Sequence, residues 1–371
     1  MNKGYVAFVA VLGILWVVTM IVDIVMTLSI YPSKFGAIAS LTEGPTANPA
    51  FPIYVIIGLP EAVGLFYPPY LFWAVWIGVV TAAVIVFLII SLYGSVQEYA
   101  NSSLYKISEF FALNLFLSYV YIVVVAYLGH PITSPFTSGT GHFLSYFFSV
   151  TNAGLYEELI SRVTYVGIPL FIYYSWSVHG KRSPSRPNKL PWWRIIWGGG
   201  YRFGKPEIVV LVISSLIFGI AHAGSWSISK IPQAALGGVF LGVLYMRFGL
   251  YADVLFHFSV DSPGVVMTNV YGSPLATAGT TDLYSVFILV FLVAGAVVTV
   301  MYIAKLVNLI NRRKAVGAEA TPAASSATGS GYGQLNSNGP SKCPRCGSLD
   351  SNLLYDDIHR CNSCGTVYKK S

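Results

Sequence analysis

Charge is what this sequence has least of: only 10% of its 371 residues are Asp, Glu, Lys or Arg, whereas 55% are hydrophobic. Ordinary soluble domains carry about 25% charged residues, so this composition excludes a typical soluble enzyme. Apolar runs of about 20 residues, the length that crosses a bilayer as a helix, recur along the chain. We therefore expect an all-α integral membrane protein with several spans.

Cysteine is absent from residues 1–342, so no disulfide can stabilise the membrane part. The last residues contain two Cys-x-x-Cys pairs, each followed by glycine: Cys343, Cys346, Cys361 and Cys364. This spacing is typical of a zinc ribbon, in which four thiolates hold one structural Zn²⁺. About thirty residues bury too little apolar surface to fold without such a metal. A redox dithiol pair is the alternative, and we expect a protein rather than nucleic acid as the ribbon's partner.

The apolar segments predict a bundle of about eight transmembrane helices within residues 1–314. They lie at about 4–30, 70–94, 109–129, 143–177, 207–223, 231–249, 251–271 and 283–310. The fourth is long and contains Pro169, where we expect a kink. A short apolar piece at 51–59 is predicted to be interfacial or re-entrant, and Trp192–Trp197 to be an interfacial aromatic anchor.

Basic residues are distributed unevenly between the loops. The loop at 179–206 holds seven Lys or Arg residues and no acid, and three more follow the last span at 312–314. The positive-inside rule then places both termini in the cytoplasm, where thiols stay reduced. Small polar residues at 315–341 predict a flexible linker to the ribbon at 342–371.

Ionisable residues inside the predicted spans are costly, at about 2.5–3.5 kcal/mol each near the bilayer centre. Polar groups at that depth face a bundle interior or a water-filled cavity, so we expect the spans that carry them to surround one cavity. Three spans supply the candidate residues: Glu157, Glu158 and Arg162 in the fourth, His222 in the fifth, and Asp253, His257 and Asp261 in the seventh.

The two adjacent glutamates have different neighbours on a helix. Glu158 and Arg162 are spaced i,i+4, so they share a face and can pair; such a pair is either structural support or only a helix-packing contact. Glu157 lies about 100° further round the helix and is free to face the cavity. Asp253 is predicted to be an N-cap or a helix-dipole partner, and the isolated Asp23 a packing or water contact.

The HExxH, GxSG and GxGD patterns of common proteases are absent. A Glu and a His can still hold and deprotonate a water molecule, and a second His with a carboxyl can stabilise an oxyanion. The same residue types ligate zinc. We expect no permanently bound catalytic zinc, although the residues leave a metal open.

The motifs Glu157-Glu158-x-x-x-Arg162, Phe218-x-x-x-His222 and His257-x-x-x-Asp261 follow one another on three apolar segments. This order resembles the signature of the CPBP family, the CAAX prenyl protease and bacteriocin-processing (Abi) intramembrane endopeptidases, over about residues 140–265. The resemblance implies four catalytic residues, with Glu157 as the general base, His222 holding the water, and His257 and Asp261 positioning the scissile carbonyl and stabilising the oxyanion. It implies supporting roles for Glu158, Arg162 and Phe218.

We therefore expect an intramembrane endopeptidase that acts on a membrane-associated protein or peptide, either a prenylated CAAX-type substrate or a bacteriocin-like one. No nucleotide cofactor is expected. A proton- or ion-coupled transporter is the first alternative, because buried Glu, His and Asp also form relays, but no internal repeat supports it. A membrane scaffold that recruits partners through the ribbon is the second, yet none of the motif residues is missing.

Overall fold

The structure is a computed structural model. It describes residues 3–42, 101–133, 143–179, 191–223, 226–319, 351–355, 358–361 and 367–369, together with 78, 81, 82 and 85. The chain divides into two units, Met1–Leu309 and Ile310–Ser371. The predicted interfacial piece at 51–59 lies outside the described residues, and the predicted second span at 70–94 is described only at its four isolated helical positions.

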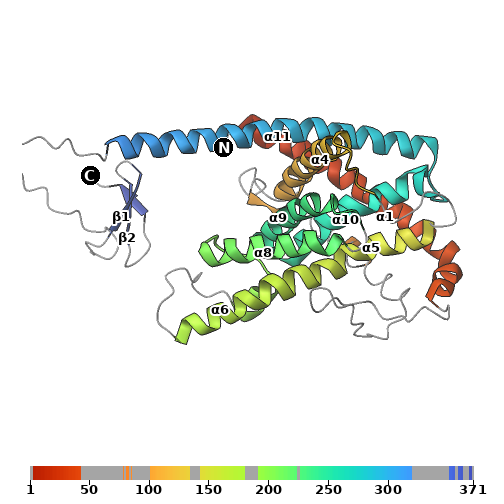
Figure 1. Cartoon of the computed structure of the whole chain (residues 1–371), viewed down its shortest axis with the longest axis horizontal. Helices are drawn as coiled ribbons and strands as arrows, with labels where there is room; N and C mark the ends of the chain where they lie inside the picture. The colour runs from red at the N-terminus through yellow and green to blue at the C-terminus, as the bar shows by residue number, and fades with distance from the viewer. Residues whose placement is uncertain are drawn as a thin grey trace, which may run out of the picture. The chain divides into compact units, whose positions relative to one another are not determined.

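The described part of the first unit is helical, as the composition predicted (Figure 1). Its elements are α1 (Lys3–Thr42), α4 (Ser103–Tyr127), α5 (Phe143–Glu158), the π-helix η1 (Leu159–Gly167), α6 (Ile168–His179), α7 (Trp192–Trp197), α8 (Lys205–His222), α9 (Lys230–Phe248), α10 (Leu250–Met267), the 3-10 helix η2 (Asn269–Tyr271) and α11 (Ala278–Glu319).

Five described helices are long and apolar enough to cross a membrane: α1, α4, α8, α9 and α11. They coincide with five of the eight predicted spans, which confirms a polytopic membrane protein. The predicted fourth span is the continuous helical stretch of α5, η1 and α6, and the predicted seventh is α10. The helix α11 continues to Glu319, so the predicted linker is helical at its beginning.

The fourth span departs from α-helical geometry where Pro169 predicted an irregularity. The nine residues Leu159–Gly167 form a π-helix, in which the Ile168 N–H donates to the Val163 carbonyl five residues back. Proline has no N–H and its ring crowds the preceding turn, and a π segment is one way in which a helix absorbs such a disturbance. The π-helix begins directly after Glu158.

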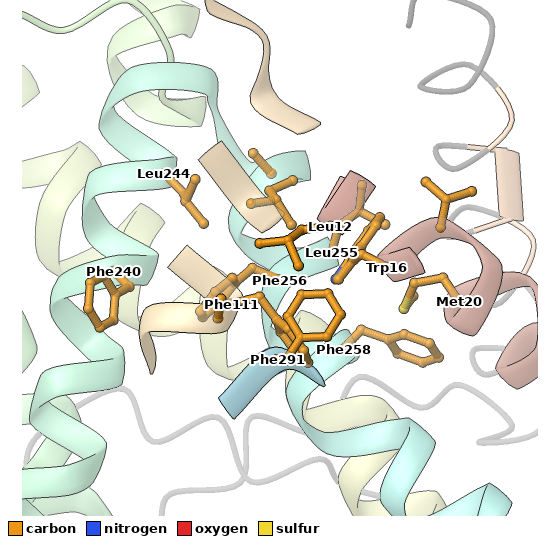
Figure 2. Packing of buried hydrophobic residues seen from close by; sticks show 14 of the residues in the cluster. Leu12, Trp16, Met20, Phe111, Phe240, Leu244, Leu255, Phe256, Phe258 and Phe291 are labelled. Atoms are coloured by element: carbon orange, nitrogen blue, oxygen red, sulfur yellow. The ribbon is translucent and has the colours of Figure 1, made fainter. Parts of the chain in front are cut away.

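Aromatic and aliphatic side chains from α1, α4, α9, α10 and α11 meet in the core of the first unit (Figure 2). The Phe111 and Phe291 rings meet edge to face, with centroids 5.0 Å apart. At Gly154, an added Cβ would lie 3.2 Å from the Phe258 backbone nitrogen, so α5 packs tightly on α10. This packing buries α10 in the middle of the bundle, beside the residues that end α5.

Two consecutive helices, α8 and α9, pack closely along their length. A Cβ at Gly219 would lie 2.7 Å from the Ile231 carbonyl oxygen, and one at Gly238 would lie 3.1 Å from the Ser215 Cα. The end of α8, where His222 lies, is therefore held beside the beginning of α9.

The short helix α7 exposes three tryptophans and buries Ile195. This is the distribution that the predicted interfacial aromatic anchor requires. The Tyr245 hydroxyl of α9 donates to the Ile196 carbonyl, and the Tyr201 hydroxyl donates to the Ile195 carbonyl. These bonds fix α7 against the bundle.

The second unit contains a three-stranded antiparallel sheet in the order β1 (Ser351–Tyr355), β2 (Ile358–Cys361) and β3 (Val367–Lys369). In it, Ser351 is paired with Cys361, and His359 with Tyr368. Cys361 ends β2 and is fully buried. The cysteines at 343, 346 and 364 lie outside the described residues, so the zinc ribbon stays a prediction.

Candidate active site

The structure brings together the ionisable residues of the three predicted spans. A carboxylate oxygen of Glu157, at the end of α5, lies 3.8 Å from Nε2 of His222 and 3.9 Å from Nε2 of His257. On α10, His257 Nε2 lies 3.2 Å from an Asp261 carboxylate oxygen. Three separate helices therefore direct these four side chains to one place, which we call the reaction face.

Glu158 lies behind this face and is fully buried. Its Oε2 accepts a hydrogen bond of 2.8 Å from Nε of Arg162, whose side chain is also fully buried. The pairing predicted from the i,i+4 spacing is therefore confirmed. On its other side, Oε1 lies 2.7 Å from Nδ1 of His257, so Glu158 also orients a histidine on another helix, a contact that the spacing along the chain could not indicate.

The hydrogen-bond partners assign roles to the ring nitrogens of both histidines. His222 Nδ1 lies 2.8 Å from the Phe218 carbonyl oxygen, which only accepts, so Nδ1 carries the proton and Nε2 faces Glu157. His257 Nδ1 likewise donates to the Glu158 carboxylate, which leaves its Nε2 facing Glu157 and Asp261. Each histidine is thus held at Nδ1 and presents Nε2 to the reaction face.

The Phe218 ring contacts both histidines and the Arg162 guanidinium. Its ring centroid lies 4.7 Å from that of His222 and 6.0 Å from that of His257. The Arg162 guanidinium carbon lies 5.2 Å from the same ring, within the range of a cation–π contact. Phe218 therefore separates the buried guanidinium from the two imidazoles, while its carbonyl holds His222.

Asp253 is not the N-cap that the sequence suggested. The N-cap of α10 is Gly249, whose positive φ of 107° ends α9 and starts α10 without a steric cost. Asp253 lies in the first turn and is fully buried, and its Oδ1 accepts from the Val254 N–H at 2.8 Å. Its carboxyl lies next to Glu158 and Arg162, so it belongs to the buried charge group behind the site, at a helix start as a dipole partner requires.

Asp23 lies apart from the reaction face. It is fully buried on α1, and its carboxyl lies next to the Ser262 hydroxyl of α10. Among the described residues, Asp23 forms no ion pair with a catalytic candidate, which fits the predicted packing role.

The spacing of the reaction face suits a bound water molecule. The Glu157 oxygen lies 3.8 and 3.9 Å from the two Nε2 atoms, which is longer than a direct hydrogen bond and is the spacing that a bridging water fills. Within the described ranges, no group of three or more His, Cys, Asp or Glu side chains is arranged as a metal site. The same Glu and His side chains are zinc ligands by type, so a catalytic metal stays an open prediction.

Comparison with known proteins supports the motif resemblance. Residues 139–262 match the family model for type II CAAX prenyl endopeptidases, Rce1-like, whereas searches of curated proteins and of solved structures gave no match. The matched segment starts shortly before α5 and ends just after Asp261, so it contains all the motif residues. Residues 139–262 are therefore similar to the Rce1-like type II CAAX prenyl endopeptidase domain, in agreement with the CPBP signature of the sequence.

Proposed function

We propose that the protein is an intramembrane endopeptidase in which Glu157 activates a water molecule held between itself, His222 and His257. The observation that carries the proposal is the convergence of one carboxylate oxygen and two imidazole nitrogens at 3.8 and 3.9 Å. They come from helices that are separate in sequence, within a segment that is similar to an endopeptidase domain.

The chemistry follows from these positions. Glu157 takes a proton from the water while the water oxygen attacks the scissile carbonyl carbon. His257 lies between the Glu158 carboxylate at Nδ1 and the Asp261 carboxylate, 3.2 Å from Nε2, so in this step it is an imidazolium whose Nε2–H donates to the oxyanion that forms. The protonated Glu157 then gives its proton to the leaving amine, and the C–N bond breaks.

Glu158, Arg162 and Asp253 support this chemistry from behind. They touch His257 or one another rather than the space in front of Glu157. We assign them a positioning role, because a histidine that donates from Nδ1 to a fixed carboxylate keeps one ring orientation.

The substrate we propose is a membrane-associated protein or peptide cut close to its C-terminus. The family supports a prenylated CAAX-type peptide as the first candidate, and an unmodified peptide of the bacteriocin type is the second. The ribbon at 342–371 would hold a structural zinc and recruit a protein partner.

Both termini are proposed to be cytoplasmic. In that orientation α8 runs from Lys205 at the inner side to His222 at the outer side, so the reaction face would lie nearer the outer surface. Single cysteines at Ile228 and Lys205, both exposed, test this with a membrane-impermeant maleimide on intact cells. We expect labelling at 228 and none at 205; the reverse pattern would contradict the orientation.

The assay that tests the activity uses purified protein in nanodiscs, with farnesylated and unmodified C-terminal peptides. We expect Glu157→Ala and His222→Ala to lose about 10²–10⁴-fold in kcat/KM, the usual contribution of general acid–base catalysis. Asp282→Asn, a change to an exposed acid on α11, is the matched control. Undiminished cleavage by both site variants would refute the assignment.

Cleavage that survives exhaustive chelation, with the ribbon zinc measured separately, would argue against a catalytic metal.

A further inference from the structure

One cation beside the reaction face has no part in the proposed chemistry. Lys230, the first residue of α9, is partly buried. Its Nζ lies 4.6 Å from the centroid of the Trp226 ring, and its charge interacts with those of Asp261 and Glu157. Among the described residues, no carboxylate forms an ion pair with it within 4.0 Å.

The backbone at Lys230 is fixed close to His222. The Trp226 N–H donates to the His222 carbonyl at 2.9 Å, which ties the turn after α8 to the end of that helix. The Tyr121 hydroxyl of α4 donates to the Ser229 carbonyl at 2.8 Å. With Ile231 packed against Gly219, these contacts hold the backbone of Ser229 and Lys230 beside the end of α8.

A cation in this position favours an anion as its ligand. The N-terminal end of a helix carries partial positive charge, which opposes an ammonium and attracts a negative group. The contact with Trp226 satisfies one side of the ammonium but supplies no counter-charge. Glu157 and Asp261 face the two histidines instead, so an arriving carboxylate would be the direct partner of Lys230.

A peptide cut near its C-terminus brings such an anion with it. An extended chain advances about 3.3–3.6 Å per residue, so a terminal carboxylate two or three residues beyond the scissile bond lies about 7–11 Å from it. The stem of a lysine at the edge of the site can cover part of that span. We propose that Lys230 binds the C-terminal carboxylate of the substrate and thereby makes the enzyme prefer chain ends to internal peptide bonds, an inference that rests on the proposed function.

The competing explanation is that Lys230 only balances the charge of Glu157 and Asp261. The two explanations differ in what they predict for the substrate. A carboxylate subsite affects only substrates that carry the carboxylate, whereas charge balance affects every substrate equally.

The test uses two peptides that are identical except that one ends in a free carboxylate and the other in a carboxamide. Wild type should favour the carboxylate by about 10- to 100-fold in kcat/KM, the usual value of a hydrogen bond to a charged group, mainly through KM. Lys230→Met should reduce the carboxylate peptide to the level of the amide and leave the amide peptide unchanged. Lys230→Arg should retain most of the preference, because the charge is kept.

Lys205→Met is the matched control, because Lys205 is also the first residue of its helix but lies at the other end of α8; it should keep the full preference. Equal cleavage of both peptides by wild type would overturn the proposal, as would a Lys230→Met variant that slows both peptides alike. If Lys230→Met does not fold, Lys230→Arg is compared with wild type. A retained preference for the carboxylate peptide supports the proposal, and a preference lost despite the retained charge contradicts it. If wild type cleaves neither peptide, or Glu157→Ala cleaves both, the proposed function itself fails.

Discussion

The two adjacent glutamates stand in opposite environments, and the contrast separates two layers of the site. Glu158 is fully buried, with one oxygen 2.8 Å from Arg162 and the other 2.7 Å from His257. Glu157 has a side chain 26% exposed and keeps 3.8 and 3.9 Å from its histidines. The short hydrogen bonds of Glu158 fix its carboxylate in place, whereas the longer distances from Glu157 to the histidines leave room for a water molecule. The proposed function assigns the first arrangement to support and the second to the reaction.

The strongest way to sharpen this comparison is to remove the charge of Glu157 without changing its shape. Glu157→Gln should lower kcat/KM by about 10²–10⁴-fold, because an amide cannot take a proton from water. The midpoint of thermal unfolding should stay close to that of wild type, since the distances of 3.8 and 3.9 Å from Glu157 to the histidines are longer than hydrogen bonds. A large fall in the midpoint would show that Glu157 is also structural.

The supporting layer should respond in the opposite way. Arg162→Met leaves the buried Glu158 without its guanidinium, and the loss of one partner of a buried pair costs about 3–5 kcal/mol of stability. We expect a clearly lower unfolding midpoint, measured on the purified protein in detergent.

The double variant Glu158→Gln/Arg162→Met checks the cause of that loss. Removing both charges should recover part of the stability, because no unpaired charge remains in the bundle. Activity should stay low, since the amide can no longer accept from His257 Nδ1 as a carboxylate does. Full recovery of activity would contradict the positioning role of Glu158.

Phe218 lies between the layers, and its replacement should have the smallest effect. Phe218→Leu keeps the backbone carbonyl that holds His222 and removes only the ring beside Arg162. We expect a loss of about 1 kcal/mol in stability, as for other partly volume-conserving core changes, and a fall of less than tenfold in kcat/KM. A loss as large as that of Glu157→Gln would show that the ring itself takes part in the reaction.

Much of this site could be predicted from the sequence, because the signals are local. The helical spacing of Glu158 and Arg162 predicted their pair, and the cost of charge in a membrane singled out the three spans that converge. Of the two roles predicted for Asp253, the N-cap was wrong, because Gly249, four residues earlier and with a positive φ, holds that position. A kink was predicted at Pro169, and the structure has a π-helix over Leu159–Gly167, before that proline, a form that depends on how the whole span packs.

The sequence by itself determined the membrane class, the spans and the identity of the ionisable residues, since periodicity and composition are properties of neighbouring residues. Only the tertiary structure decided which glutamate is buried in direct bonds and which faces the two Nε2 atoms. The bond from His257 to Glu158 joins residues 99 positions apart, and the position of Lys230 beside the end of α8 depends on how α8 and α9 pack. Such contacts arise from helices meeting in space, and no spacing along one helix encodes them.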